Sequence, residues 1–167
     1  MAKKDLVGKD CIAGLNRAAK YELGHFHMYS QMANIMQQTG YFGARDYFLS
    51  DAKEEIGHYQ GHVDLLNKLG VLGDMPALTP LVPNKIMTLR EIIDIAYDQM
   101  VELLEFYREF YSKIEEEYPD IANHINHYLK LQDDAVGYYG DIIATMTAEK
   151  NNPNINMIID KRLGKDA

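Results

Sequence analysis

The stretch Thr88–Phe110 (TLREIIDIAYDQMVELLEFYREF) decides the fold, because apolar residues recur in it every three or four positions. Thr88 is followed three residues later by Glu91, and this pair is the sequence signature of a capping box at a helix start. No proline or glycine interrupts the stretch. It therefore predicts a long amphipathic helix whose apolar stripe consists of Leu89, Ile92, Ile93, Ala96, Met100, Leu103, Leu104, Tyr107 and Phe110.

Long proline-free blocks on either side of this stretch predict further helices. Proline breaks helix interiors, and the prolines of this chain lie at positions 76, 80, 83, 119 and 153. Two glycines within 39–43 split the first block, and Tyr118-Pro119 forms a second turn. Residues 71–85 make a proline-rich connection. We expect helices at about 6–38, 44–69, 88–117, 120–150 and 155–163.

These elements predict an all-α protein. The two short turns make neighbouring helices antiparallel, while the long connection between the second and third helices can return along their length. This pattern is typical of a four-helix bundle with one long crossover. We therefore expect a single domain over residues 1–167, with the bundle at about 6–150 and a short fifth helix at about 155–163.

The composition excludes several classes of function. The 167 residues are 47% hydrophobic and carry a net charge of −8, so we expect a folded protein that does not bind nucleic acid. The single cysteine, Cys11, excludes a disulfide framework and a cysteine-rich metal site. No apolar run approaches the ~18 residues of a membrane span, and residues 1–10 lack the apolar stretch of a signal peptide. We expect a cytoplasmic protein with no membrane partner.

Polar residues interrupt the apolar pattern on three helices. Glu22 lies in the middle of the first helix's apolar stripe, seven residues after Leu15 and seven before Tyr29. The second helix carries the pattern E-x-x-H at Glu55–His58, and residues three apart share one helix face. A glutamate from one helix with E-x-x-H from its neighbour is the ligand set of a carboxylate-bridged iron site in a bundle core. On the fourth helix, the amide of Gln132 is also predicted to point inward.

Each of these features has a simpler explanation. E-x-x-H is frequent on solvated helix faces, and a lone buried glutamate can be hydrogen-bonded to a tyrosine. The combination favours a metal site, because Glu22 and Glu55 lie at similar distances from the turn that joins their helices. Four other histidines are expected to be structural or exposed, namely His25 and His27 beside the first stripe and His124 and His127 near one end of the fourth helix.

In their order and spacing, these residues resemble the ferritin family, and most closely its non-haem bacterial members. The resemblance extends from Leu15 to Leu163. It implies that Glu22, Glu55 and His58 bind iron, with Gln132 from the fourth helix, and that Tyr29 is catalytic. The matching segments are Leu15-Asn16, Glu22, Tyr29–Met32, Ala52–His58, Tyr118-Pro119, Gln132 with Ala135, and Met157–Lys161.

The resemblance also implies a function. Members of the family act as ferroxidases: they take in iron(II), oxidise it with oxygen or peroxide, and store the ferric mineral inside a hollow homo-oligomeric shell of 24 subunits. Iron ions are therefore the expected partners. The residue after Glu55, where bacterioferritins carry their haem methionine, is Ile56, so no haem is expected.

One position departs from the family pattern. The family supplies a further glutamate from the third helix, and here that position is Met100, while Asp98 and Glu102 lie about 200° away around the helix. A thioether is a poor ligand for iron(III). The second iron position therefore borrows Glu54, uses Gln132 weakly, or is lost. In each case we expect slower iron oxidation than at a complete site.

Three other functions stay open at this point. A structural shell subunit with a degenerate site is compatible with Met100. A rubrerythrin-like peroxidase would share the bundle, but the chain has no Cys-x-x-Cys pair for a rubredoxin iron. A DNA-associated mini-ferritin would need a basic tail with more than Lys3, Lys4 and Lys9, and the fifth helix argues against its smaller shell.

Overall fold

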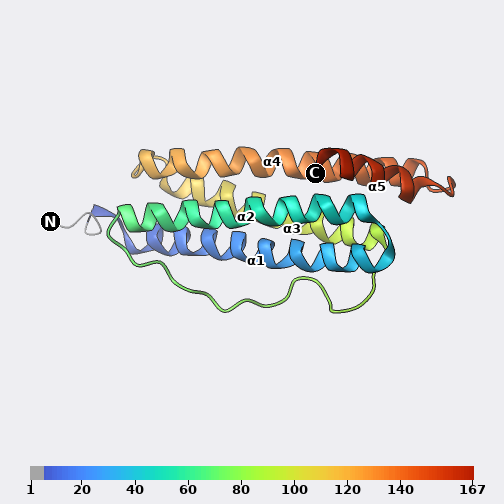
Figure 1. Ribbon diagram of the computed structural model, residues 1–167. Helices are drawn as coiled ribbons and strands as arrows, with labels where there is room; N and C mark the ends of the chain where they lie inside the picture. Colours follow the sequence, from blue (N-terminus) through green and yellow to red (C-terminus); the bar gives the residue numbers. More distant parts are fainter. Residues whose placement is uncertain (1–5) are drawn as a thin grey trace.

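The computed structural model describes residues 6–167, and no strand occurs among them. α1 packs along α2, α3 packs along α4, and α5 lies against α2. Figure 1 shows the two helical hairpins side by side, with the connection 69–88 running outside α1 along the length of the bundle. The predicted all-α four-helix bundle with one crossover and a fifth helix is confirmed. The helices are α1 (Lys9–Thr39), α2 (Phe42–Lys68), α3 (Leu89–Ile114), α4 (Pro119–Ala148) and α5 (Ile155–Asp166).

Residues 1–5 lie outside the described residues. The start of the predicted domain falls within them. So does the first half of residues 1–10, the segment that was expected to lack a signal peptide. Lys3 and Lys4 of the short basic segment also fall within them.

The helix ends agree with the predictions to within a few residues. The capping box of α3 is present, because the Thr88 side chain accepts from the Glu91 N–H and the Glu91 carboxylate accepts from the Thr88 N–H. Gly40 and Gly70 follow α1 and α2 in the left-handed conformation, with φ of 82° and 77°. The left-handed conformation of Gly40 alone makes the turn between α1 and α2. Gly43 is therefore not needed for the turn and is already helical, so α2 begins at Phe42, earlier than expected. At the other end of the chain, α5 continues past the predicted limit to Asp166.

The apolar stripes face the core. Every residue of the stripe predicted for α3 is buried, and so are Met28 and Met32 of α1, which the sequence indicates as core filling. Charged residues occupy the opposite faces of the helices. Within the part of the chain that the structure describes, no helix has the length and apolar character needed to cross a bilayer.

A layer of polar side chains divides the core into two apolar clusters. One cluster lies toward α5 and includes Met32, Phe48 and Ile93. The other lies toward the opposite end of the bundle and includes Leu15 and Leu103. The buried polar residues between the clusters are Glu22, His25, Glu55, His62 and Gln132.

α5 completes the start of α2. The residue that precedes α2, Tyr41, provides no side-chain cap. Asp160 of α5 takes this role, because its Oδ1 accepts a hydrogen bond from the Ala44 N–H at 2.8 Å. A Cβ atom added at Gly43 would overlap the backbone carbonyl of Asp160. The approach of α5 to α2 therefore requires glycine at position 43.

This contact gives a matched pair of stability predictions on one helix. We expect Gly43→Ala to lower the free energy of unfolding by about 1–3 kcal/mol, because the methyl group overpacks the α2–α5 contact. Gly57→Ala, on the same helix with nothing within 4 Å of the added atom, should raise it by about 0.5–1 kcal/mol. Chemical denaturation of both variants measures the difference. Equal effects at the two positions would contradict the proposed packing of α5.

Candidate metal centre

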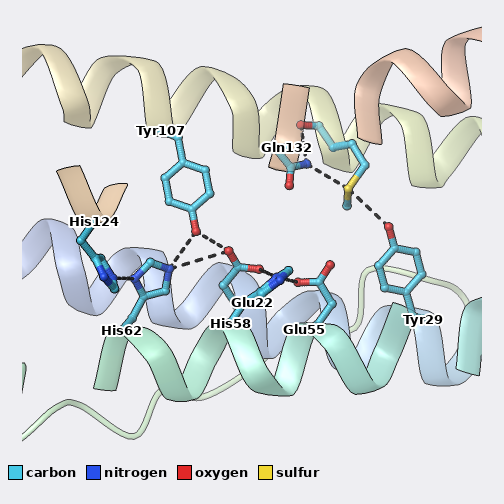
Figure 2. A network of polar contacts seen from close by, with 9 residues as sticks. Glu22, Tyr29, Glu55, His58, His62, Tyr107, His124 and Gln132 are labelled. Carbon is cyan, nitrogen blue, oxygen red and sulfur yellow. Dashed lines mark hydrogen bonds and ion pairs between the residues drawn. The ribbon is translucent and has the colours of Figure 1, made fainter. Parts of the chain in front are cut away.

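Two buried carboxylates from α1 and α2 lie close together in the polar layer. Glu22 is 2% exposed and Glu55 is 7% exposed. Figure 2 shows both side chains with His58 beside them, between the ribbons of the two helices. An isolated charge in such a place costs several kcal/mol, so a buried pair of this kind needs hydrogen bonds, a shared proton or a bound cation.

These carboxylates use only part of their hydrogen-bonding capacity. The Tyr107 hydroxyl of α3 donates to Glu22 Oε1, and His62 Nε2 lies 3.8 Å from the same oxygen. Among the described residues, none forms a hydrogen bond with Glu22 Oε2 or Glu55 Oε2. His58 Nδ1 lies 3.6 Å from the first of these oxygens and 3.4 Å from the second. Two carboxylate oxygens and one imidazole nitrogen thus converge without being saturated.

The pKa values of the three side chains are shifted in different directions. Burial acts to raise the pKa of Glu22, but its interactions with Glu55, His58 and His62 outweigh burial and hold this pKa well below its ordinary value. Burial, and after it the charge of Glu22, raises the pKa of Glu55 well above its ordinary value. Burial acts to lower the pKa of His58, yet the two glutamates raise it to about 10. At neutral pH and without metal, His58 therefore holds a proton, and Glu22 is the glutamate of the pair that carries negative charge more readily.

His25 belongs to the same buried group. The sequence leaves it structural or exposed, and the structure buries it completely. Neither ring nitrogen forms a hydrogen bond with a residue of 6–167, although Gln99 of α3 lies nearby. Burial lowers the pKa of His25, so its ring is neutral. One ligand atom from each of Glu22, His25 and Glu55 lies within 4.8 Å of the others.

The position of the missing third-helix glutamate is filled by a hydrogen-bonded thioether. Met100 is buried, and its Sδ accepts hydrogen bonds from the Tyr29 hydroxyl at 3.3 Å and the Gln132 amide at 2.9 Å. Gln132 also donates to the Met100 carbonyl at 2.9 Å. The nitrogen of the Gln132 amide is therefore directed at α3. Three acidic residues named from the sequence are exposed and stay outside the buried group, namely Asp98 and Glu102, which flank Met100, and Glu54 of α2.

The sequence alone does not identify the hydrogen-bond network around Glu22, which extends through Tyr107 of α3 and His62 of α2 to His124 of α4. Tyr107 is predicted only as a core residue, because the sequence does not indicate which group a tyrosine in an apolar stripe forms a hydrogen bond with. His62 is buried, with Nε2 2.9 Å from the Tyr107 hydroxyl and Nδ1 3.0 Å from His124 Nε2. His124 was expected on the surface but is half-buried against His62, whereas His127 is exposed. For His62 a signal existed, since it continues the face of Glu55 and His58 by one turn.

The observed arrangement brings Glu22, Glu55 and His58 together as predicted from their spacing. Carboxylate oxygen and imidazole nitrogen are ligands that divalent first-row metals accept, iron(II) and zinc among them. Their role as metal ligands stays a prediction, as does that of Gln132.

Comparisons with known proteins agree with this architecture. A family model described as a ferritin-like domain matches residues 12–148. Because the match covers most of the sequence, the chain belongs to the ferritin family, as its motifs predict. No curated protein sequence matches the chain significantly.

Solved structures show the same fold. An open-pore ferritin from the hyperthermophilic archaeon Archaeoglobus fulgidus matches with a TM-score of 0.85 at 19% identity, over 98% of each chain. A humanized archaeal ferritin matches with a TM-score of 0.86 at 16% identity, over 95% of this chain and 97% of the other. At such identities the similarity establishes the fold alone.

The raised pKa of His58 predicts how the stability of the metal-free protein depends on pH. A pKa raised from 6.5 to about 10 means that the contribution of His58 is fully present below about pH 6.5 and is lost as pH rises through about 10. The loss should be on the order of a few kcal/mol, since one pKa unit corresponds to about 1.4 kcal/mol. Urea denaturation between pH 6 and 10 measures it. His58→Gln should flatten the profile, while His127→Gln, at an exposed histidine, should leave it unchanged; similar profiles for both would contradict the assignment.

Proposed function

We propose that this chain is the subunit of an iron-storage ferritin, which binds iron(II) between α1 and α2, oxidises it and retains the ferric mineral. The observation that carries this proposal is the buried pair Glu22 and Glu55, with one unpartnered oxygen each beside His58. Membership of the ferritin family supports it. The shell that we propose is hollow, homo-oligomeric, built of 24 subunits and cytoplasmic, and the net charge of −8 per chain would attract cations to it.

The ligand set suits ferroxidation of a substrate ion. Imidazole and carboxylate accept iron(II), and anionic oxygen ligands stabilise the iron(III) that forms when the ion gives one electron to oxygen or peroxide. When iron(II) enters, His58 would release the proton that its raised pKa gives it in the metal-free protein. Because a proton leaves on entry, binding is favoured as pH rises.

Tyr29 we propose as a catalytic residue at the second iron position. Its hydroxyl donates to Met100 Sδ and accepts a longer hydrogen bond from the Tyr139 hydroxyl, at 3.4 Å. Burial, and after it the charge of Asp51, raises the pKa of Tyr29 well above its ordinary value, so the side chain stays a neutral phenol. It is therefore a hydrogen-bond donor beside the carboxylate pair throughout the physiological range.

A second candidate function is favoured by one observation. Because a methionine occupies the position of the family's third-helix carboxylate, a structural shell subunit with a degenerate ferroxidase site fits the same fold. Such a subunit would assemble normally but oxidise iron no faster than a variant without the glutamate pair.

Particle mass and iron content of the purified protein separate the candidates. We expect about 24 chains with a ferric core, and we expect Glu22→Gln/Glu55→Gln to form the same shell without catalysed loading. Shells of 24 that load equally with and without the glutamates would indicate the structural subunit. About 12 chains that retain DNA would indicate the mini-ferritin, and a dimer would indicate the peroxidase.

Restoring the missing carboxylate should accelerate oxidation. In Met100→Glu, the Tyr29 hydroxyl and the Gln132 amide that now donate to the thioether can donate to the new carboxylate, so the side chain is tolerated. Stopped-flow measurement at two iron(II) per subunit should show an oxidation rate about tenfold higher, equivalent to about 1.4 kcal/mol of barrier. Met100→Leu controls for loss of the sulfur. A wild-type rate that already matches Met100→Glu would show that the site is not impaired.

A further inference from the structure

α1 carries its own copy of the motif that identifies the site on α2. Glu22-Leu23-Gly24-His25 has the same E-x-x-H spacing as Glu55-Ile56-Gly57-His58. Residues three apart share a helix face, and both motifs face the polar layer, since Glu22, His25 and Glu55 are buried and His58 lies against the two glutamates. Each helix therefore provides one carboxylate and one imidazole to the same region of the core.

The ring of His25 has no hydrogen bond of normal geometry, although Gln99 of α3 lies nearby. His25 is completely buried, and neither ring nitrogen forms a hydrogen bond with any residue that the structure describes. Buried polar groups are almost always hydrogen-bonded, because an unpartnered one loses its hydration without compensation. An apolar residue of similar size would pack there at lower cost. The ring nitrogens of His25 therefore need a partner that the described residues do not supply.

We propose that this partner is a metal ion: His25 is the terminal ligand of a second divalent transition-metal ion, which shares Glu22 and Glu55 with the ion beside His58. This inference rests on the proposed function and specifies how the second position is built. The ligand atoms of Glu22, His25 and Glu55 lie within 4.8 Å of one another. Ligands at about 2.0–2.2 Å from a common ion lie at most about 4.4 Å apart, so a small side-chain movement closes the site.

The carboxylate pair can serve two ions. Each glutamate has two oxygens, so together they can bridge two metal ions, and one imidazole then completes each position. On α1 the imidazole is that of His25, and on α2 it is that of His58, whose Nδ1 already lies 3.4 Å from Glu55 Oε2 and 3.6 Å from Glu22 Oε2. The same pair of ions would also provide partners for Glu22 Oε2 and Glu55 Oε2, which have no hydrogen bond among the described residues.

Polar groups of α3 and α4 near the carboxylates already have partners on these helices or on α1. The Gln132 amide nitrogen donates both to the carbonyl and to the Sδ of Met100. Glu102 is exposed and accepts a hydrogen bond from the Tyr21 hydroxyl at 2.9 Å. The second ion is thus held by an imidazole from α1 in place of a carboxylate from α3. A neutral ligand stabilises iron(III) less than an anionic one, which agrees with slow oxidation at a site that still binds two ions.

Cobalt(II) titration of the full-length, metal-free protein tests the assignment without relying on catalysis. We expect two cobalt ions per chain in the wild type, one in His25→Leu, and two in His27→Leu, which removes an exposed histidine from the same helix. Anomalous scattering at the cobalt edge should show the position near His25 vacant in His25→Leu and the position near His58 retained. Two cobalt ions in His25→Leu would overturn the proposal, and so would a single wild-type ion bound by both histidines.

Thermal stability gives a second readout that a merely structural histidine would not produce. His25→Leu should melt about 2–4 °C higher than the wild type when metal-free, because the unpartnered ring is gone, but should gain less on cobalt addition. A metal-free variant that melts lower, with an unchanged gain from cobalt, would overturn the proposal. Failure of the proposed function is distinguishable, because then neither the wild type nor His58→Gln would bind cobalt at all.

Discussion

The burial of two carboxylates in one layer of the bundle is the constraint on which the rest of the structure depends. Glu22 and Glu55 cannot both be charged there without compensation: the pKa of Glu22 is held well below its ordinary value, whereas the pKa values of Glu55 and His58 are raised. Tyr107 and His62 direct their polar groups at Glu22. A bound cation would compensate the same negative charge, and on this ground we propose a metal site in this layer.

The two hairpins contribute different groups to this layer. The α1–α2 hairpin carries the carboxylates and the imidazoles, while the α3–α4 hairpin covers them with hydrogen-bonding groups that are already paired, such as Met100 with Gln132. The apolar clusters lie on both sides of the layer, and its two carboxylates are buried. An oxygen ligand in such surroundings interacts with a metal ion more strongly than it would in solution.

The fold was predictable from the sequence because its signals are local and repeated. The capping box at Thr88, the glycines at 40 and 70, and the apolar stripes each act within a few residues, and all are found in place. The convergence of Glu22, Glu55 and His58 was predictable too, since helix periodicity and a short turn fix their relative heights. The network beyond them was not, because the bond of Tyr107 to Glu22 and that of His62 to His124 depend on how separate helices face each other. For the same reason the sequence left His25 as structural or exposed, since a position beside the stripe does not reveal which of the two holds.

The four side chains that we propose as ligands on α1 and α2 lie between positions 22 and 58, within a single hairpin that turns at Gly40 and Tyr41. The loop that must close to bring them together is short, and the entropy lost on closure grows with loop length. Metal binding by these residues would therefore depend little on how the α1–α2 hairpin is aligned with the α3–α4 hairpin. A change on the third helix, such as Met100 in the place of an acid, would therefore leave the proposed ligands of the first hairpin in position.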